Sequence, residues 1–172
     1  FAAESFISIT MFKPAFFIRC AFAVFICSIS ATVLSAQTIS LNFVRGSSGA
    51  SSLSPGDVAG AVPVGNWNNA PQANADNHSN FALNDDSGAA SGATATWSSG
   101  GSSWSVGTSG SGGASDKLMM TGYLDQGGNG AGQIHTITIN NIPYATYDVY
   151  LYHSSSGGAN RTARYNANGV DL

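Results

Sequence analysis

The strongest constraint on the fold is the alternation of short apolar runs with turn-rich stretches after residue 36. Thr38–Arg45 (TISLNFVR) places Ile39, Leu41 and Phe43 on one face of an extended segment, which is the period of a half-buried strand. Glycine, serine and asparagine fill the stretches between such runs, and no segment there shows the apolar period of a helix. The pattern predicts an all-β fold, an antiparallel β-sandwich or barrel, over residues 37–172.

Other short runs in this region predict further strands. They are Ala93–Ser98, Ser103–Val106, Lys117–Tyr123, Gln133–Asn140, Thr146–His153 and Arg161–Asn168. In the run that begins at Thr146, we expect Tyr147, Val149 and Leu151 to point inward, because alternate residues of a strand share a face. Two longer stretches, Gly46–Ala75 and Ser98–Ser115, are rich in turn residues, and each contains a tryptophan. The alternative is a flexible linker, but we expect both to be ordered loops packed around the sandwich.

The end of the sequence resembles an unfinished hairpin. Asn168-Gly169 is the dipeptide of a tight hairpin turn, and the strand that returns from it has only begun at Leu172. We therefore expect residues 37–172 to be a domain that is incomplete at its C-terminus. Other domains of the same longer polypeptide are then its expected neighbours.

Residues 11–36 read as an export signal. Lys13 and Arg19 supply the positive charge, Cys20–Val33 is an uncharged apolar run, and Leu34-Ser35-Ala36 offers small residues for cleavage before Gln37. The alternative is a transmembrane anchor, but the apolar run is shorter than the roughly 20 residues that span a bilayer. We expect translation to begin at Met11, so that residues 1–10 are translated upstream sequence rather than protein, and we expect a signal-peptide helix over 11–36. The mature domain is then secreted or envelope-exposed, with no membrane contact after cleavage.

The composition of the exported part excludes several classes of function. Both cysteines lie in the leader, so the domain has no disulfide, and four Lys and Arg stand against eight Asp after residue 36. A nucleic-acid partner would need a basic face, so none is expected. The aspartates are scattered, no Gly-x-Ser-x-Gly turn is present, and the three histidines lack metal-ligand spacing. We expect no catalytic residues and no enzyme activity.

Calcium is the one cofactor that the sequence leaves open. Asn74–Asn80 and Asn84–Ser87 are rich in side-chain oxygens, which calcium accepts at short separations. The alternative is that these Asn and Asp residues cap turns through hydrogen bonds to the backbone. We favour turn capping, and therefore predict no cofactor and no metal site.

Several segments together resemble known domains. Thr136–Tyr152 (TITINNIPYATYDVYLY) resembles a signature of galactose-binding-like jelly rolls, and the opening strand with Asn42 before a glycine turn is similar to malectin-like sandwiches. Val62–Asn69, Lys117–Asp125 and the Tyr-Asp-Val-Tyr strand look like a recurring domain of secreted environmental bacterial proteins that often end in a PEP-CTERM-type sorting tail. The resemblance implies a jelly-roll sandwich and carries over no activity.

Sugar binding is the function that the residue types favour. It needs an aromatic plane and planar polar side chains, which the loop residues Asn66, Trp67 and Asn68 combine. A second set of residues could supply the same chemistry on a sheet face: Tyr150 and Tyr152, with Arg161 or Arg164 on the following strand. The alternative is that Trp67 packs inside one end of the sandwich and the tyrosines form cross-strand pairs. The expected function is a carbohydrate-binding module with a glycan partner; the alternative is a structural surface or matrix domain without a small ligand.

Overall fold

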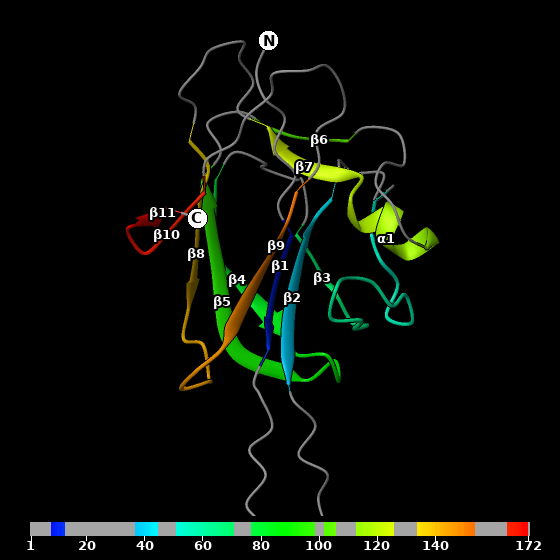
Figure 1. Ribbon diagram of the computed structural model, residues 1–172, viewed down its shortest axis with the longest axis horizontal. Helices are drawn as coiled ribbons and strands as arrows, with labels where there is room; N and C mark the ends of the chain where they lie inside the picture. The colour runs from blue at the N-terminus through cyan, green and yellow to red at the C-terminus, as the bar shows by residue number, and fades with distance from the viewer. Residues whose placement is uncertain are drawn as a thin grey trace, which may run out of the picture.

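The computed structural model describes residues 8–12, 37–44, 51–70, 77–98, 102–105, 113–125, 134–153 and 165–171. Strands dominate these residues, and most of their pairings are antiparallel (Figure 1). The all-β prediction is therefore confirmed for the part of the chain that can be described. Within that part, no helix is long and apolar enough to cross a bilayer.

The first sheet has four strands in the order β3-β2-β1-β9. Its strands are β1 (Ser8–Phe12), β2 (Thr38–Phe43), β3 (Asn68–Ala70) and β9 (Asp148–Tyr152). β1 runs antiparallel to both β2 and β9, whereas β3 runs parallel to β2. Figure 1 shows β1 lying between β2 and β9 along most of their length. All six residues of β2 are buried, because both of its faces are covered.

β1 spans the boundary that was expected between residues 10 and 11. Residues 1–10 were expected to be upstream sequence and 11–36 a separate leader helix, yet Ser8–Phe12 crosses that boundary as one strand. Ile9 and Met11 are buried in the core, because the order Ser-Ile-Thr-Met alternates as a strand does. The remainder of the expected leader, residues 13–36, lies outside the described residues.

The second sheet has three strands in the order β4-β5-β8. They are β4 (Asn77–Asn84), β5 (Ala90–Ser98) and β8 (Thr136–Asn140), paired antiparallel. β4 corrects the expectation of an oxygen-rich loop over Asn74–Asn80: the described part of that segment, from Asn77, pairs with β5. β4 was not predicted from the sequence because most of its residues are polar and only Leu83 is buried, so no alternation of apolar residues marks it as a strand.

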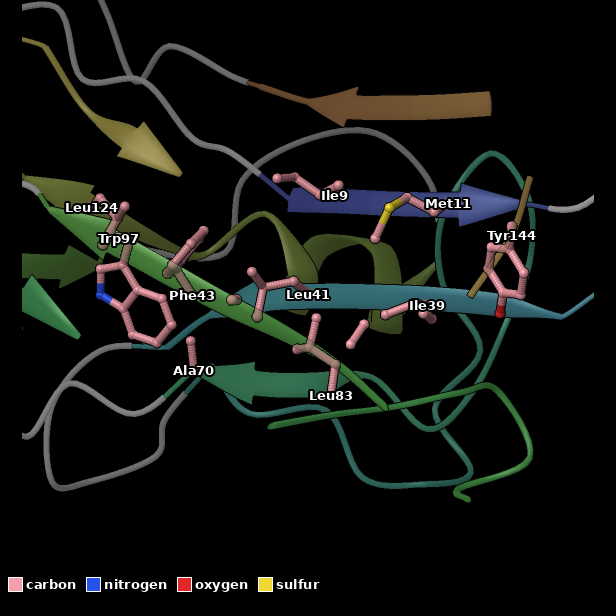
Figure 2. Packing of buried hydrophobic residues seen from close by; sticks show 12 residues of the cluster. Ile9, Met11, Ile39, Leu41, Phe43, Ala70, Leu83, Trp97, Leu124 and Tyr144 are labelled. Atoms are coloured by element: carbon pink, nitrogen blue, oxygen red, sulfur yellow. The ribbon is translucent and has the colours of Figure 1, made fainter. Parts of the chain in front are cut away.

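One hydrophobic core joins the two sheets. Its buried members from the first sheet include Ile39, Leu41 and Phe43, and the second sheet contributes Leu83 and Trp97. Figure 2 shows these side chains gathered in one layer with Ile9 and Met11 of β1. The Phe43 and Trp97 rings meet edge to face with centroids 5.4 Å apart, an arrangement that aromatic pairs favour.

The segment Lys117–Tyr123 is not the strand that its sequence predicted. The short helix α1 (Ala114–Met119) precedes β7 (Gly122–Asp125), which pairs with β6 (Ser102–Ser105). The Asp116 carboxylate accepts a hydrogen bond from the Gly113 N–H (3.1 Å) in the first turn of the helix, and this contact satisfies a backbone donor that the helix leaves free.

The hairpin predicted at Asn168-Gly169 is confirmed. β10 (Asn166–Ala167) pairs antiparallel with β11 (Val170–Asp171). Asn168 and Gly169 both have positive φ, at 50° and 86°, as the two-residue turn requires. Residues 161–164, the first part of the predicted strand Arg161–Asn168, lie outside the described residues.

Candidate functional site

The segment Asn66–Asn69 connects the second of two hydrophobic clusters to the first sheet. This second cluster consists of Leu53, Ala59, Val64, Trp67, Met119, Met120 and Tyr123, with Val62, Leu118 and Tyr152 packed against it. It lies under the loop of residues 51–66, where Ala59 and Val64 form an isolated antiparallel bridge. The expectation of an ordered loop is thus confirmed for residues 51–70.

Trp67 is a core residue. Its side chain is 4% exposed, and its indole Nε1 donates a hydrogen bond to the Val64 carbonyl (2.9 Å). The Tyr152 ring meets it edge on, with centroids 6.2 Å apart. A sugar needs an open ring face on which to stack, and burial removes that face. The structure therefore contradicts Trp67 as an exposed platform and supports the alternative that it packs inside the domain.

The Asn68 side chain joins the two sheets. Its Nδ2 donates to the Ser40 carbonyl of β2 (2.9 Å) and to the Asn84 carbonyl of β4 (2.8 Å). Its Oδ1 accepts a hydrogen bond from the Asn84 N–H (2.8 Å). Both amide protons and one oxygen lone pair are therefore engaged by the backbone, and the side chain is buried. Little of this amide is left to bind a ligand hydroxyl.

Asn69 does the same between β3 and the loop that precedes it. Its Nδ2 donates to the Leu53 carbonyl (2.8 Å), and its Oδ1 accepts from the Leu53 N–H (2.9 Å). The same Oδ1 accepts from Nδ2 of Asn42 (3.1 Å), which is its neighbour in the β2–β3 register. Asn42 also donates to the Ser51 carbonyl (2.8 Å) and is completely buried. The side-chain amides of Asn42 and Asn69 therefore hydrogen-bond the backbone of the loop at Ser51 and Leu53, and so attach the loop to the sheet.

Asn66 is the least buried of the three loop residues predicted to bind a ligand. Its backbone has φ of 51°, a conformation that asparagine tolerates better than most residues. Its Nδ2 donates to the Asp86 carbonyl (2.7 Å), and its N–H donates to the Pro55 carbonyl (3.0 Å). The side chain thus anchors this loop to the turn between β4 and β5.

The second predicted set of binding residues is only partly described. Tyr150 and Tyr152 are half-buried on β9, and the Tyr152 hydroxyl accepts a hydrogen bond from the Ala61 N–H (3.0 Å). Tyr152 therefore contacts Trp67 of the first set, whereas sequence reasoning kept the two sets apart. Arg161 and Arg164 lie outside the described residues.

The acidic turn between β4 and β5 uses its oxygens internally. Oδ1 of the buried Asp85 accepts from the Ser87 N–H (2.9 Å), the Ser87 hydroxyl (2.6 Å) and the Ala89 N–H (3.1 Å). Its Oδ2 accepts from Nε2 of Gln37 (3.2 Å). This is the side-chain capping of a turn. The described residues contain no group of three or more His, Cys, Asp and Glu side chains placed to hold a metal ion.

Tyr144 lies beside this turn. Burial, and then the negative charges of Asp85 and Asp86, raise the pKa of its phenol. Its hydroxyl has no hydrogen-bond partner among the described residues, so the ring contributes packing to the core rather than a polar contact.

Sequence reasoning missed that Asn42 is the partner of Asn69 inside the fold. The available signal was the position of asparagine at neighbouring places in two strands, at Asn42 and in Asn68-Asn69. Only the parallel β2–β3 register brings these positions together, and that register is not written in either segment alone.

Comparison with known proteins does not extend this picture. No family model matches the chain, and neither a curated protein nor a solved structure matches it.

Proposed function

We propose that the chain is a non-catalytic β-sandwich module of an exported polypeptide, and that its role is structural. The observation that carries this proposal is the internal use of the Asn66–Asn69 segment. Trp67 is buried, and the amides of Asn68 and Asn69 bind backbone groups. A ligand site would keep such groups directed toward a cleft. Here they hold a loop and two sheets together.

The finer fold assignment is part of the same proposal. Two antiparallel-rich sheets that share one core are compatible with a jelly-roll sandwich of the galactose-binding-like kind. We place the module in a longer extracellular or cell-surface protein, where neighbouring domains are its partners. The basis is the leader pattern of residues 11–36 together with the absence of cysteine from residues 37–172.

The test separates a structural Trp67 from a binding Trp67. We expect Trp67→Ala to lower the free energy of unfolding by roughly 3–5 kcal/mol, the usual cost of truncating a buried tryptophan. We also expect the unmutated chain to bind no glycan on an array. Loss of an established glycan signal in Trp67→Ala, at an unchanged melting temperature, would overturn the structural role.

Glycan binding by β9 is the second candidate. The observation that favours it is the exposed Tyr147, 38% exposed, which directly precedes the exposed Asp148 of β9 and lies three residues before the half-buried Tyr150. An exposed aromatic ring beside a carboxylate offers stacking and hydrogen bonding to a weakly bound sugar. Tyr147→Ala and Tyr150→Ala should then abolish array binding while the melting temperature stays within a few degrees of that of the parent.

A further inference from the structure

The first sheet depends on β1, part of which falls within the expected leader. β1 pairs with β2 on one side and with β9 on the other, and among the described strands it is the one that pairs with β9. Its residues Ile9 and Met11 are 7% and 2% exposed within the shared core. Cleavage after Ala36 would remove all of these contacts.

Removal of β1 would leave a slot one strand wide. β2 and β9 would be left about 9–10 Å apart, twice the spacing of paired strands, with unpaired backbone groups facing each other. Such edges bind any extended segment that can supply the missing N–H and C=O groups. Two positions in the floor of the slot would be open to apolar side chains, where Ile9 and Met11 now lie.

Both walls of the slot have supports that do not involve β1. β2 remains paired with β3 and packed against the second sheet. The end of β9 is held by Tyr152, whose hydroxyl accepts a hydrogen bond from Ala61 and whose ring meets Trp67. These contacts oppose the collapse of β9 onto β2.

We propose that the space between β2 and β9 is a strand-acceptor site, filled by Ser8–Phe12 before leader cleavage and afterwards by an extended segment of a partner polypeptide. The segment runs antiparallel to both walls and carries aliphatic side chains at two alternate positions, as Ser8–Phe12 does. Strand addition of this kind takes its affinity from backbone hydrogen bonds and its specificity from the inward side chains. The biological role rests on the export that is part of the proposed function.

The test keeps the full chain. A specific protease sequence is introduced between residues 24 and 30, the protein is folded intact and then cut, and a fluorescent peptide with the sequence of residues 6–14, FISITMFKP, is added. We expect the labelled peptide to replace the native strand and to bind saturably. A peptide with Ile9→Lys and Met11→Lys should bind at least about 100-fold more weakly, because two buried aliphatic side chains are lost. A Thr10→Pro peptide should also fail, because proline removes a backbone donor.

Three results would overturn the proposal. The cut chain could unfold in a way that added peptide does not reverse, or it could keep the melting temperature of the uncut chain and bind no peptide. The third result is equal binding of the native, Lys-substituted and Thr10→Pro peptides. Export is tested separately by mass spectrometry of the secreted protein. Retention of residues 8–12 there would refute leader removal in the cell and leave the peptide result standing.

Discussion

Replacing Asn68 tests whether a single amide holds the two sheets together. Asn68→Ala removes hydrogen bonds to the Ser40 carbonyl, the Asn84 carbonyl and the Asn84 N–H. A typical intramolecular hydrogen bond contributes about 0.5–1.5 kcal/mol net, so losing three lowers the free energy of unfolding by about 1.5–4.5 kcal/mol. For a chain of this size, that corresponds to a fall in Tm of about 5–15 °C.

The assay is thermal and denaturant unfolding of Asn68→Ala beside Asn77→Ala as a control. Asn77 belongs to β4 as Asn84 does, but it is exposed, so its replacement should change the free energy of unfolding by less than about 0.5 kcal/mol. Equal stability of the two variants would refute the argument that the Asn68 amide joins the sheets.

Asn68→Asp sharpens the test through pH. The new carboxylate keeps an acceptor for the Asn84 N–H but places its second oxygen against the carbonyls of Ser40 and Asn84. The charged form is disfavoured in the fold, so the pKa of the new group lies above its unfolded value. The stability that the protonated side chain contributes is therefore retained at low pH and lost as the pH rises through the pKa of the folded state. Relative to the parent, we expect a larger deficit at about pH 7 than at about pH 4.

Three further predictions follow from single contacts. Gly122→Ala should destabilise by about 1–3 kcal/mol or prevent folding, because its Cβ would collide with the Phe43 carbonyl, whereas Gly56→Ala meets no atom within 4 Å and should be neutral; equal melting temperatures would refute this. Tyr144→Phe should be at least as stable as the parent at neutral pH, and it should lose less stability above about pH 10, because the raised pKa makes ionisation of the buried phenol unfavourable. Calcium or EDTA should leave the Tm unchanged, since the Asp85 oxygens already accept hydrogen bonds; a rise with calcium would contradict this.

Alternation predicted the strands that bury apolar side chains. β2, β5 and β8 fall within the predicted runs or extend them by a few residues, because β-branched and aromatic residues at every second position suit a half-buried sheet. β9 was predicted as a strand, but the prediction of which side chains point inward was only partly right. Leu151 packs on the core, whereas Val149 is 49% exposed. The facing of a strand near a sheet edge depends on which segments cover it, and that information is not local.

The errors have physical causes of the same kind. α1 is too short to show a helical period, and its start depends on Asp116, whose carboxylate accepts hydrogen bonds from both Gly113 and the distant Gly60. β4 is mostly polar, with apolar residues only at Phe81–Leu83, and it forms a strand by pairing with β5. For the site, residue type suggested that Trp67 was important, but Met119 and Tyr123, far along the chain, decide that it is buried.

The pairing of β1 with β9 also has a consequence for the time course of folding. Phe12 pairs with Asp148, so the first sheet cannot form completely until β9, near the end of the chain, is available to pair with β1. Contacts between such distant parts of a chain slow folding, because the entropy of the intervening loop is lost before the contact forms. Because synthesis starts at the N-terminus, β1 lacks its β9 partner until most of the chain has been made. Closure of the first sheet is therefore expected to follow synthesis of the chain rather than to accompany it.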